Sequence, residues 1–320
     1  MLDKIASSGK ALLAMTNKRL TMPLITLFSA PKPFTNPHIA TIQRNAIKSW
    51  TLLPDVEVIL LGEETGLAEA ARDLGVKHLS NVARNEAGTP LISSMFQLAR
   101  ENSDNELLCI INADIILFPD FVEAARQVAK LNDKFVSMSQ RWDLDVTELL
   151  DFSGDWEARL RERVKSQGDL HRPMGSDFFL FPRSSFLDMP AFAIGRAGWD
   201  NWMIYKSRKE GWATVDATPS ITIIHQNHDY SHLPGGQPHY RHPETDVNIH
   251  LAGGREVTRF TLYDVNYRLS NGRLISRKWN WPALRRAVES YPLLVWNDYD
   301  LSAKLHVFFR RFRSKKNKAQ

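Results

Sequence analysis

Two oxygen-bearing side chains follow one of the most apolar runs of the sequence and could bind a divalent cation. The run Leu107–Ile111 is followed by Asn112, Ala113 and Asp114. Side chains two residues apart on an extended chain point the same way, so Asn112 and Asp114 can act together. Carboxylate and amide oxygens are the ligands that Mg²⁺ and Mn²⁺ prefer. A turn or a helix cap favours the same residue types, so the motif by itself leaves both interpretations open.

A second group of chemically active residues is a cluster of histidines. Six of the ten histidines lie between residues 225 and 250, beginning with His225 and His228. Imidazole is a common metal ligand and titrates near neutral pH. The spacing matches neither the HExxH pattern nor a Cys/His zinc pattern. We therefore predict a functional loop over 225–254, with a plain polar loop as the alternative.

Two more aspartates lie beside aromatic and apolar residues. Asp200 is flanked by Trp199 and, two residues later, Trp202, and Asp177 precedes the apolar run Phe178–Phe181. A carboxylate surrounded by tryptophans has a raised pKa and can act as a general base. Asp177 could accept a substrate hydroxyl, and the tryptophans could form a platform for a sugar ring. The alternatives are a helix N-cap for Asp200, a turn for Asp177 and core packing for the tryptophans.

The elements that position these residues alternate between strands and helices. From Pro23 onward, apolar β-branched runs alternate with segments of helical period, which predicts βαβ units and a mostly parallel sheet. Ligands of such sheets bind beyond the carboxyl ends of the strands. We expect strands at 24–28, 56–61, 76–79 and 107–112, and helices around 39–50, 67–74 and 90–99.

The second half of the chain is less regular. We expect strands at 135–139, 178–181 and 221–224, and helices at 156–165, 198–210, 281–290 and from 302 onward. The expected fold class is α/β, a Rossmann-like sheet flanked by helices with a C-terminal helical extension. We expect a helical lead-in over 1–22, one catalytic domain over 23–255 with halves 23–118 and 119–255, and an extension with a basic tail over 256–320.

Composition and charge narrow the class of protein. The 320 residues carry a formal net charge of +5, but six cations lie after Phe309, and removing them leaves −1. We therefore expect no nucleic-acid partner. Cys109 is the only cysteine, which excludes an intrachain disulfide and suggests a reducing compartment. No apolar run reaches the roughly 20 residues that cross a bilayer. The apolar and basic segment 305–318 suggests contact with an anionic membrane surface, and a solvated helix end is the alternative.

Taken together, these motifs resemble the GT-A-fold nucleotide-diphospho-sugar glycosyltransferases, in particular their family-two-like members, from about Pro23 to Tyr230. The resemblance implies transfer of a sugar from a nucleotide diphosphate donor to a hydroxyl of a glycan or lipid-linked glycan, with a Mn²⁺ or Mg²⁺ cofactor and inversion favoured. Asn112-Ala113-Asp114 resembles the DxD metal motif of that family, with Asn112 in place of the first acid. The segment with Trp199 and Asp200 resembles the one that carries the catalytic base.

The resemblance also assigns roles to individual residues. It implies that Ser29, Ala30, Arg84, Thr89, Asn112 and Asp114 bind the donor. Asp177, Trp199 and Trp202 would bind the acceptor or sugar, and Asp200 would be the base. Asp114, His225 and His228 would hold the metal, with the choice of histidine left open.

Three alternatives stay open at the level of sequence. They are a non-catalytic glycan- or membrane-binding module, a sugar nucleotidyltransferase and a metal-dependent hydrolase. The loop after the first strand, Ser29 to Pro33, has no glycine and so argues against the nucleotidyltransferase. We expect a cytoplasmic protein, peripheral to the cytoplasmic face of a membrane through its tail, that takes part in polysaccharide biosynthesis. The sequence carries no prediction of oligomeric state.

Overall fold

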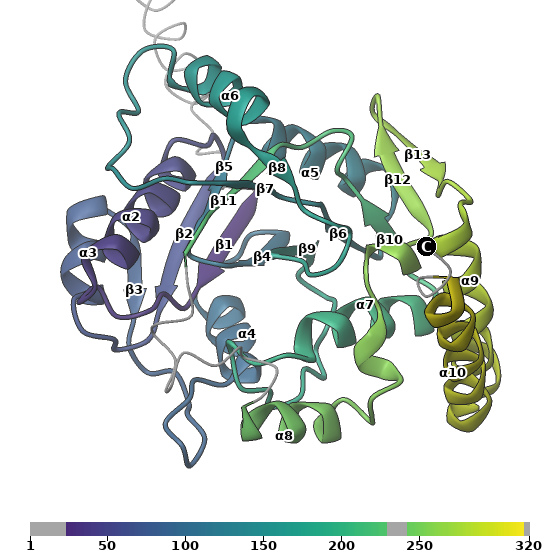
Figure 1. Ribbon diagram of the computed structural model, residues 1–320. Coiled ribbons are helices and arrows are strands. Elements are labelled where there is room, and N and C mark those ends of the chain that lie inside the picture. The colour runs from purple at the N-terminus through teal and green to yellow at the C-terminus, as the bar shows by residue number, and fades with distance from the viewer. Residues whose placement is uncertain (1–23, 229–241, 317–320) are drawn as a thin grey trace, which may run out of the picture.

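The computed structural model describes residues 24–228 and 242–316, with side chains up to Arg311. The described residues form a nine-stranded sheet in the order β13-β12-β10-β6-β9-β4-β1-β2-β3 and a four-stranded sheet in the order β5-β11-β7-β8 (Figure 1). The expected α/β fold with a mostly parallel sheet and flanking helices is confirmed. The helical lead-in expected over 1–22 lies outside the described residues.

The first half is built of parallel βαβ units. Strands and helices alternate as predicted, in the order β1 (Ile25–Ser29), α2 (Pro37–Thr51), β2 (Val56–Leu61), α3 (Leu67–Leu74), β3 (Lys77–Leu79), α4 (Ile92–Glu101) and β4 (Leu107–Ile111). β1 pairs in parallel with both β2 and β4, and β2 pairs in parallel with β3. The carboxyl ends of β1, β2 and β4 therefore meet at one edge of the sheet.

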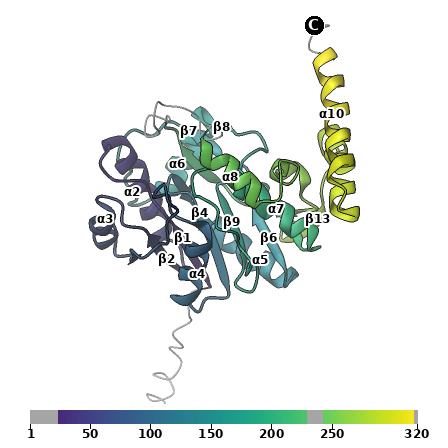
Figure 2. The same ribbon diagram turned by 90° about the horizontal axis from the view of Figure 1, so that it is seen from below.

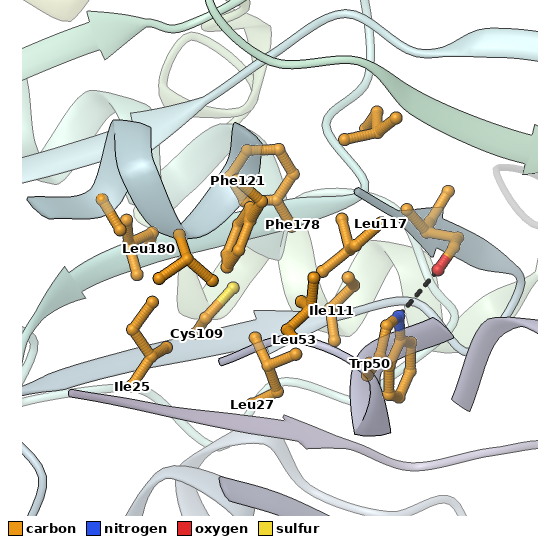
Figure 3. Close-up of a cluster of buried hydrophobic side chains, with 14 of the residues drawn as sticks. Ile25, Leu27, Trp50, Leu53, Cys109, Ile111, Leu117, Phe121, Phe178 and Leu180 are labelled. Atoms are coloured by element: carbon orange, nitrogen blue, oxygen red, sulfur yellow. Dashed lines mark hydrogen bonds between the residues drawn. The ribbon is translucent and has the colours of Figure 1, made fainter. Parts of the chain in front are cut away.

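Both faces of this sheet are covered, which explains why its strands are apolar throughout. Leu27 belongs to one buried cluster and its neighbour Phe28 to another on the opposite face. Figure 3 shows the first cluster, to which the strands contribute Leu27, Cys109 and Phe178 and the helices contribute Trp50 and Phe121. The indole of Trp50 donates a 2.8 Å hydrogen bond to the carbonyl of Ile115, which fixes α2 against the start of β5.

One strand of the large sheet runs against its neighbours. β9 (Phe178–Pro182) is antiparallel both to β4 and to β6 (Phe135–Met138). The residues that precede β9 therefore lie at the same edge as the residues that follow β4. The backbone N–H of Asn112 donates to the carbonyl of Asp177 at 2.8 Å, which joins the two segments at that edge.

A small second sheet lies beside this edge. It contains β5 (Ile115–Leu117), β7 (Trp142–Leu144), β8 (Asp169–Leu170) and β11 (Ile223–Gln226), and α6 (Trp156–Gln167) packs against it. In the antiparallel pair of β11 and β5, His225 lies opposite Ile115. This pairing brings the start of the predicted histidine loop next to Asp114.

The structure corrects the expectation of an irregular segment over 225–254. His225 and Gln226 belong to β11, and α8 (Pro243–Leu251) is helical. The ring of His242 accepts a hydrogen bond from the backbone N–H of Glu244, and Pro243 occupies the first turn. A capping acceptor followed by proline is a helix start, which a composition-based interpretation overlooks. Residues 229–241, with His232 and His239, lie outside the described residues.

The remaining elements complete the large sheet and add helices. These are α5 (Asp120–Leu131), α7 (Trp199–Lys209), β10 (Ala213–Asp216), η3 (Val257–Arg259), η4 (Leu262–Asp264), β12 (Tyr267–Ser270), β13 (Arg273–Ser276), α9 (Trp281–Tyr291), the π-helix η5 (Pro292–Trp296) and α10 (Tyr299–Lys316). Figure 2 shows α10 projecting beyond the body of the molecule. Within the described residues, no helix combines the length and the apolar character that crossing a bilayer requires.

The segment after residue 255, expected as a C-terminal extension, contributes two strands to the large sheet. β12 pairs in parallel with β10, and β13 pairs with β12. Val257, Phe260 and Leu293 are buried in the same cluster as Phe28 of the first strand. Residues on both sides of position 255 therefore share one buried cluster, and the domain division stays a prediction.

Candidate functional site

Three predicted metal ligands come together at the carboxyl edge of β4. Ligand atoms of Asp114, His225 and His228 all lie within 4.8 Å of one another. Nε2 of His228 is 3.0 Å from Oδ2 of Asp114, and Nε2 of His225 is 3.9 Å from the same oxygen. The three residues come from the loop after β4 and from β11 with the residues that follow it. One carboxylate and two imidazoles in this arrangement form a candidate site for a divalent cation.

The state of Asp114 fits that use. Burial by itself would raise the pKa of Asp114, but the hydrogen bond from His228 and the charges of His225 and Lys32 outweigh it and hold the pKa well below its usual range. Its second oxygen, Oδ1, is buried and has no hydrogen-bond partner among the described residues. An ionised carboxylate with an unsatisfied buried oxygen is suited to a cation.

His225 is oriented by a carboxylate that the sequence analysis did not identify. Its Nδ1 lies 3.1 Å from Oδ1 of Asp143 on β7, and Nδ1 of His171 donates to Oδ2 of the same carboxylate at 2.7 Å. With Nδ1 held by Asp143, Nε2 of His225 faces Asp114. Metal-binding histidines usually have such a carboxylate on the other ring nitrogen, because it fixes the ring and raises its basicity.

Arg141 connects this carboxylate to the predicted sugar-binding aspartate. Its Nε donates to Asp143 at 2.9 Å, and its Nη1 donates to Oδ1 of Asp177 at 2.7 Å. Nδ2 of Asn112 donates to the same oxygen of Asp177 at 3.0 Å. Asn112 is the residue that departs from the DxD pattern. Its side-chain amide donates a hydrogen bond to Asp177, which an ionised aspartate at this position could not do.

Asp200 lies in the first turn of α7, close enough to Asp177 for their charges to interact. Burial raises the pKa of Asp200, and the nearby charge of Asp177 raises it further against the opposing hydrogen bonds from backbone N–H groups of the first turn. Gly198, the residue just before the helix, has a φ of +114°, which is unfavourable for a residue with a side chain. A carboxylate with a raised pKa is the kind of group that accepts a proton from a substrate hydroxyl.

The two predicted platform tryptophans are core residues. Trp199 is 8% exposed and packs edge to face with Phe179 on β9. Trp202 is 7% exposed and packs against Phe186 and Phe192. Their rings hold the start of α7 on the sheet and leave little surface for a sugar. They therefore position Asp200 rather than present an open platform.

The loop after β1 approaches the site through a residue that the sequence analysis did not assign. The hydroxyl of Ser29 is buried and donates to the carbonyl of Ile111 at 2.6 Å, and Ala30 packs against the core. Nζ of Lys32 lies 3.4 Å from Nε2 of His228. The side chain of Gln43 bonds the backbone N–H and carbonyl of Lys32, at 2.6 and 2.9 Å, and so fixes this turn.

Arg84 and Thr89 lie in a separate loop with partners of their own. Nη2 of Arg84 donates to Glu64 and its Nη1 to the carbonyl of Gly88, both at 2.8 Å. The N–H of Thr89 donates to Asn85 at 2.9 Å. These contacts shape the loop between β3 and α4, and none of them joins Arg84 or Thr89 to Asp114. Their predicted donor contact stays a prediction.

The structure thus groups half of the predicted site residues. Asn112, Asp114, Asp177, Asp200, His225 and His228 belong to one continuous set of contacts and charges, which Lys32, Arg141, Asp143 and His171 extend. No local motif marks Asp143 or Arg141, since their role depends on the pairing of β7 with β11.

Neither a protein-family model nor a curated protein sequence matches this chain, whereas solved structures do. One is a mannosyltransferase from Pyrobaculum calidifontis in complex with GDP-Man and Mn²⁺, with 14% identity and a TM-score of 0.39 over 62% of this chain and 56% of the other. Another is the M. tuberculosis glucosyl-3-phosphoglycerate synthase in complex with Mg²⁺ and UDP, with 16% identity and a TM-score of 0.45 over 82% and 88%. The chain thus spans little more than half of the mannosyltransferase. Such identities and TM-scores establish no activity for this chain.

Proposed function

We propose that the protein is a metal-dependent glycosyltransferase that moves a sugar from a nucleotide diphosphate donor to a hydroxyl acceptor. The observation that carries the proposal is the cluster of Asp114, His225 and His228 at the carboxyl edge of the sheet, continuous with Asp177 and Asp200. This is the edge at which parallel sheets bind nucleotides. The same set of residues contains candidate groups for binding a cation, for binding a sugar and for accepting a proton.

Asp114, His225 and His228 would hold the cation, and Mn²⁺ or Mg²⁺ fits the oxygen and nitrogen ligands. A bound divalent ion supplies Lewis acidity that offsets the charge of a departing diphosphate. The ammonium of Lys32, beside His228, adds a positive charge on the same side. The buried surroundings strengthen these attractions by excluding water.

The acceptor side of the proposal uses the two aspartates. Asp177, fixed by Arg141 and Asn112, would accept a hydroxyl of the sugar. Asp200 would take the proton of the attacking acceptor hydroxyl, for which its raised pKa suits it. A base on the side of the sugar away from the diphosphate gives inversion, which we include in the proposal.

The proposal also covers the acceptor, the preferred metal ion, the donor and the cellular location. We propose a glycan or lipid-linked glycan acceptor, a role in polysaccharide biosynthesis, Mn²⁺ as the preferred ion and a cytoplasmic location. The neighbours named above contain a GDP-sugar with Mn²⁺, or UDP with Mg²⁺. We therefore include UDP- and GDP-sugars as the candidate donors to be tested.

The test combines metal binding with turnover. The purified full chain is incubated with UDP- and GDP-sugars, and with a CMP-sugar as the monophosphate comparison, with and without Mn²⁺, and transfer or donor hydrolysis is measured. We expect Asp114→Asn to lose both Mn²⁺ binding and turnover. We expect Asp200→Asn to keep Mn²⁺ binding and lose about 10²- to 10⁴-fold in turnover, the usual contribution of a general base.

Asp151→Asn is the matched control, because that side chain is 73% exposed and lies outside the cluster. Full turnover by Asp200→Asn would remove Asp200 from its role. Phosphate or ester hydrolysis without a sugar donor would instead indicate a metal hydrolase. Pyrophosphate release from a nucleoside triphosphate and a sugar phosphate would indicate a nucleotidyltransferase, and glycan binding independent of nucleotide and metal a non-catalytic module.

The decrease in turnover at acidic pH provides a second test of Asp200 as the base. Its pKa lies above the ordinary value of 3.8 because burial disfavours the charged form. Turnover that requires the ionised carboxylate therefore falls as the pH drops through that raised pKa. We expect the residual turnover of Asp200→Asn to lack this decrease.

A further inference from the structure

The C-terminal helices carry an unusual concentration of exposed aromatic and aliphatic side chains. Trp279, Trp281 and Trp296 are 63%, 66% and 61% exposed. We call the surface that they form with their exposed neighbours the aromatic face. Its further members are Leu284, Val288, Tyr291, Val295, Val307 and Phe308.

Helical spacing gathers these residues on one side of α9 and η5. Trp281, Leu284, Val288, Tyr291 and Val295 follow one another at intervals of three and four residues, which places them along one stripe. The buried residues of α9 are Ala283, Arg286, Glu289 and Ser290, which form the opposite side of the helix. The stripe therefore points away from the core.

α10 extends the aromatic face. The ring of Trp281 lies edge to face with Phe309, with centroids 6.3 Å apart, and Phe309 is in turn 5.4 Å from Phe308. Figure 1 shows α9 and α10 next to each other, and Figure 2 shows α10 projecting from the body. The exposed side chains of these helices therefore lie at one end of the molecule.

The charges on and around this face are mainly positive. Between residues 277 and 297 the only acid is Glu289, which is 1% exposed and bonded to Arg286. The exposed cations are Lys278, just before α9, and Lys304, Arg310 and Arg311 on α10, against one exposed acid on α10, Asp300. Arg277 lies 4.2 Å from the ring centre of Trp279.

We propose that the aromatic face docks on the surface of an anionic lipid bilayer. Tryptophan and tyrosine prefer the boundary between headgroups and hydrocarbon, and lysine and arginine beside them are attracted to anionic lipids. A second copy of the chain is a poorer partner, because a two-fold contact brings two surfaces of the same positive charge together. The face lies on the membrane without crossing it.

This proposal moves the membrane contact from where the sequence placed it. Sequence alone indicated residues 305–318, whereas three exposed tryptophans lie before α10, between 279 and 296. The insertion of side chains therefore belongs to α9 and η5, and the basic residues of α10 add electrostatic attraction. The proposal does not depend on the metal site or on Asp200.

The test is co-sedimentation of the full chain with vesicles. One preparation is phosphatidylcholine alone, and the other is an equimolar mixture with phosphatidylglycerol. We expect binding to the anionic vesicles, weakening with added salt, and little binding to phosphatidylcholine. The triple variant Trp279→Ser/Trp281→Ser/Trp296→Ser should lose the binding. Lys278→Gln/Lys304→Gln should weaken it about 25-fold, at about fivefold for each cation removed from an anionic surface.

The matched control is Leu149→Ser/Leu187→Ser, which removes two exposed leucines, 65% and 73% exposed, from other parts of the surface. This variant should bind as the unaltered protein does. The lysine variant, which removes no apolar contact, keeps the test decisive if the tryptophan variant misfolds. Equal binding by all variants, or no binding of the unaltered protein to anionic vesicles, would overturn the proposal. So would a dimer in sedimentation equilibrium that the tryptophan variant dissociates, because the face would then join two copies.

Discussion

Asp143 shows how much of the site depends on one residue outside the proposed ligands. Its carboxylate accepts hydrogen bonds from His225, His171 and Arg141, and Arg141 also donates a hydrogen bond to Asp177. Burial would raise the pKa of Asp143, but the hydrogen bonds from His225 and His171 and the charge of Arg141 keep it well below its usual range. The ionised carboxylate therefore connects the proposed metal ligand His225 to Asp177 through Arg141.

Replacing Asp143 tests this alignment. We expect Asp143→Ala to weaken Mn²⁺ binding by about 10- to 100-fold, the usual cost of removing the partner of a metal-binding histidine. Asp143→Asn, which still accepts from His225, should restore part of the affinity. Calorimetric titration of Mn²⁺ measures both, with Asp151→Ala as the control. Equal affinity in all three would show that His225 does not need Asp143.

Among the secondary-structure elements, α8 is connected to the rest of the molecule by two buried side chains, the amide of Asn248, which bonds the backbone of Ala193, and the carboxylate of Glu244. Glu244 accepts from Asn85 at 2.5 Å and from Arg196 at 2.8 Å, and it is 8% exposed. Burial would raise the pKa of Glu244, but the hydrogen bonds from Asn85, Thr89 and Arg196 outweigh it and lower the pKa. These bonds join α8 to the loop that contains the predicted donor residues Arg84 and Thr89.

Glu244→Gln should destabilise the protein in a pH-dependent way. At neutral pH we expect a loss of about 1–3 kcal/mol in unfolding free energy, because charged hydrogen bonds at a buried site are lost. The pKa of Glu244 is below 4.5 in the folded protein, so this advantage is fully present above pH 4.5 and disappears as the pH falls through the folded-state pKa.

Denaturant unfolding at about pH 7 and about pH 4 measures the difference between Glu244→Gln and the unaltered protein. Asp246→Asn on the same helix is the control, since that side chain is 77% exposed and should change stability little. A difference that stays constant between the two pH values would contradict the role given to the charge.

For the molecule as a whole, one apolar cluster joins the first strand to the C-terminal segment. Phe28 on β1, Phe181 on β9, Phe260 and Leu293 belong to the same buried cluster. Arg286, Asp264 and Glu289 add a buried charge network between α9 and η4, with Nε of Arg286 3.1 Å from Asp264. The residues after 255 therefore contribute to the stability of the sheet and are not an appendage.

Leu293→Ala tests this view. The side chain is fully buried, so we expect a loss of about 2–5 kcal/mol from removed contacts and the cavity left behind. The main unfolding transition should shift, as followed by circular dichroism in denaturant. Leu284→Ala, at a position 46% exposed, should change stability by less than about 0.5 kcal/mol. A separate early transition, affected alone by Leu293→Ala, would show an independent C-terminal unit.

The sequence by itself determined the elements of the first half closely. The strand Val56–Leu61 and the helix Leu67–Leu74 are found with the predicted bounds, because apolar runs, helical periodicity and Gly75 act within a few residues of one another. The same local logic located Asn112 and Asp114 at the end of a strand, and Asp200 at the start of a helix. The same logic overlooked α8, because the many His, Pro and Gly residues of this segment indicated a loop and hid the helix start at His242 and Pro243.

Only the tertiary structure decided how these residues combine. His225 reaches Asp114 because β11 pairs with β5, and it meets Asp143 because β7 pairs with β11, across more than eighty residues in each case. Asp177 joins Asn112 because β9 runs antiparallel to β4. The burial of the tryptophans beside Asp200 and the exposure of those in and around α9 and η5 also depend on which elements pack together. Such pairings are selected by the free energy of the whole fold, and no local pattern of residues specifies them.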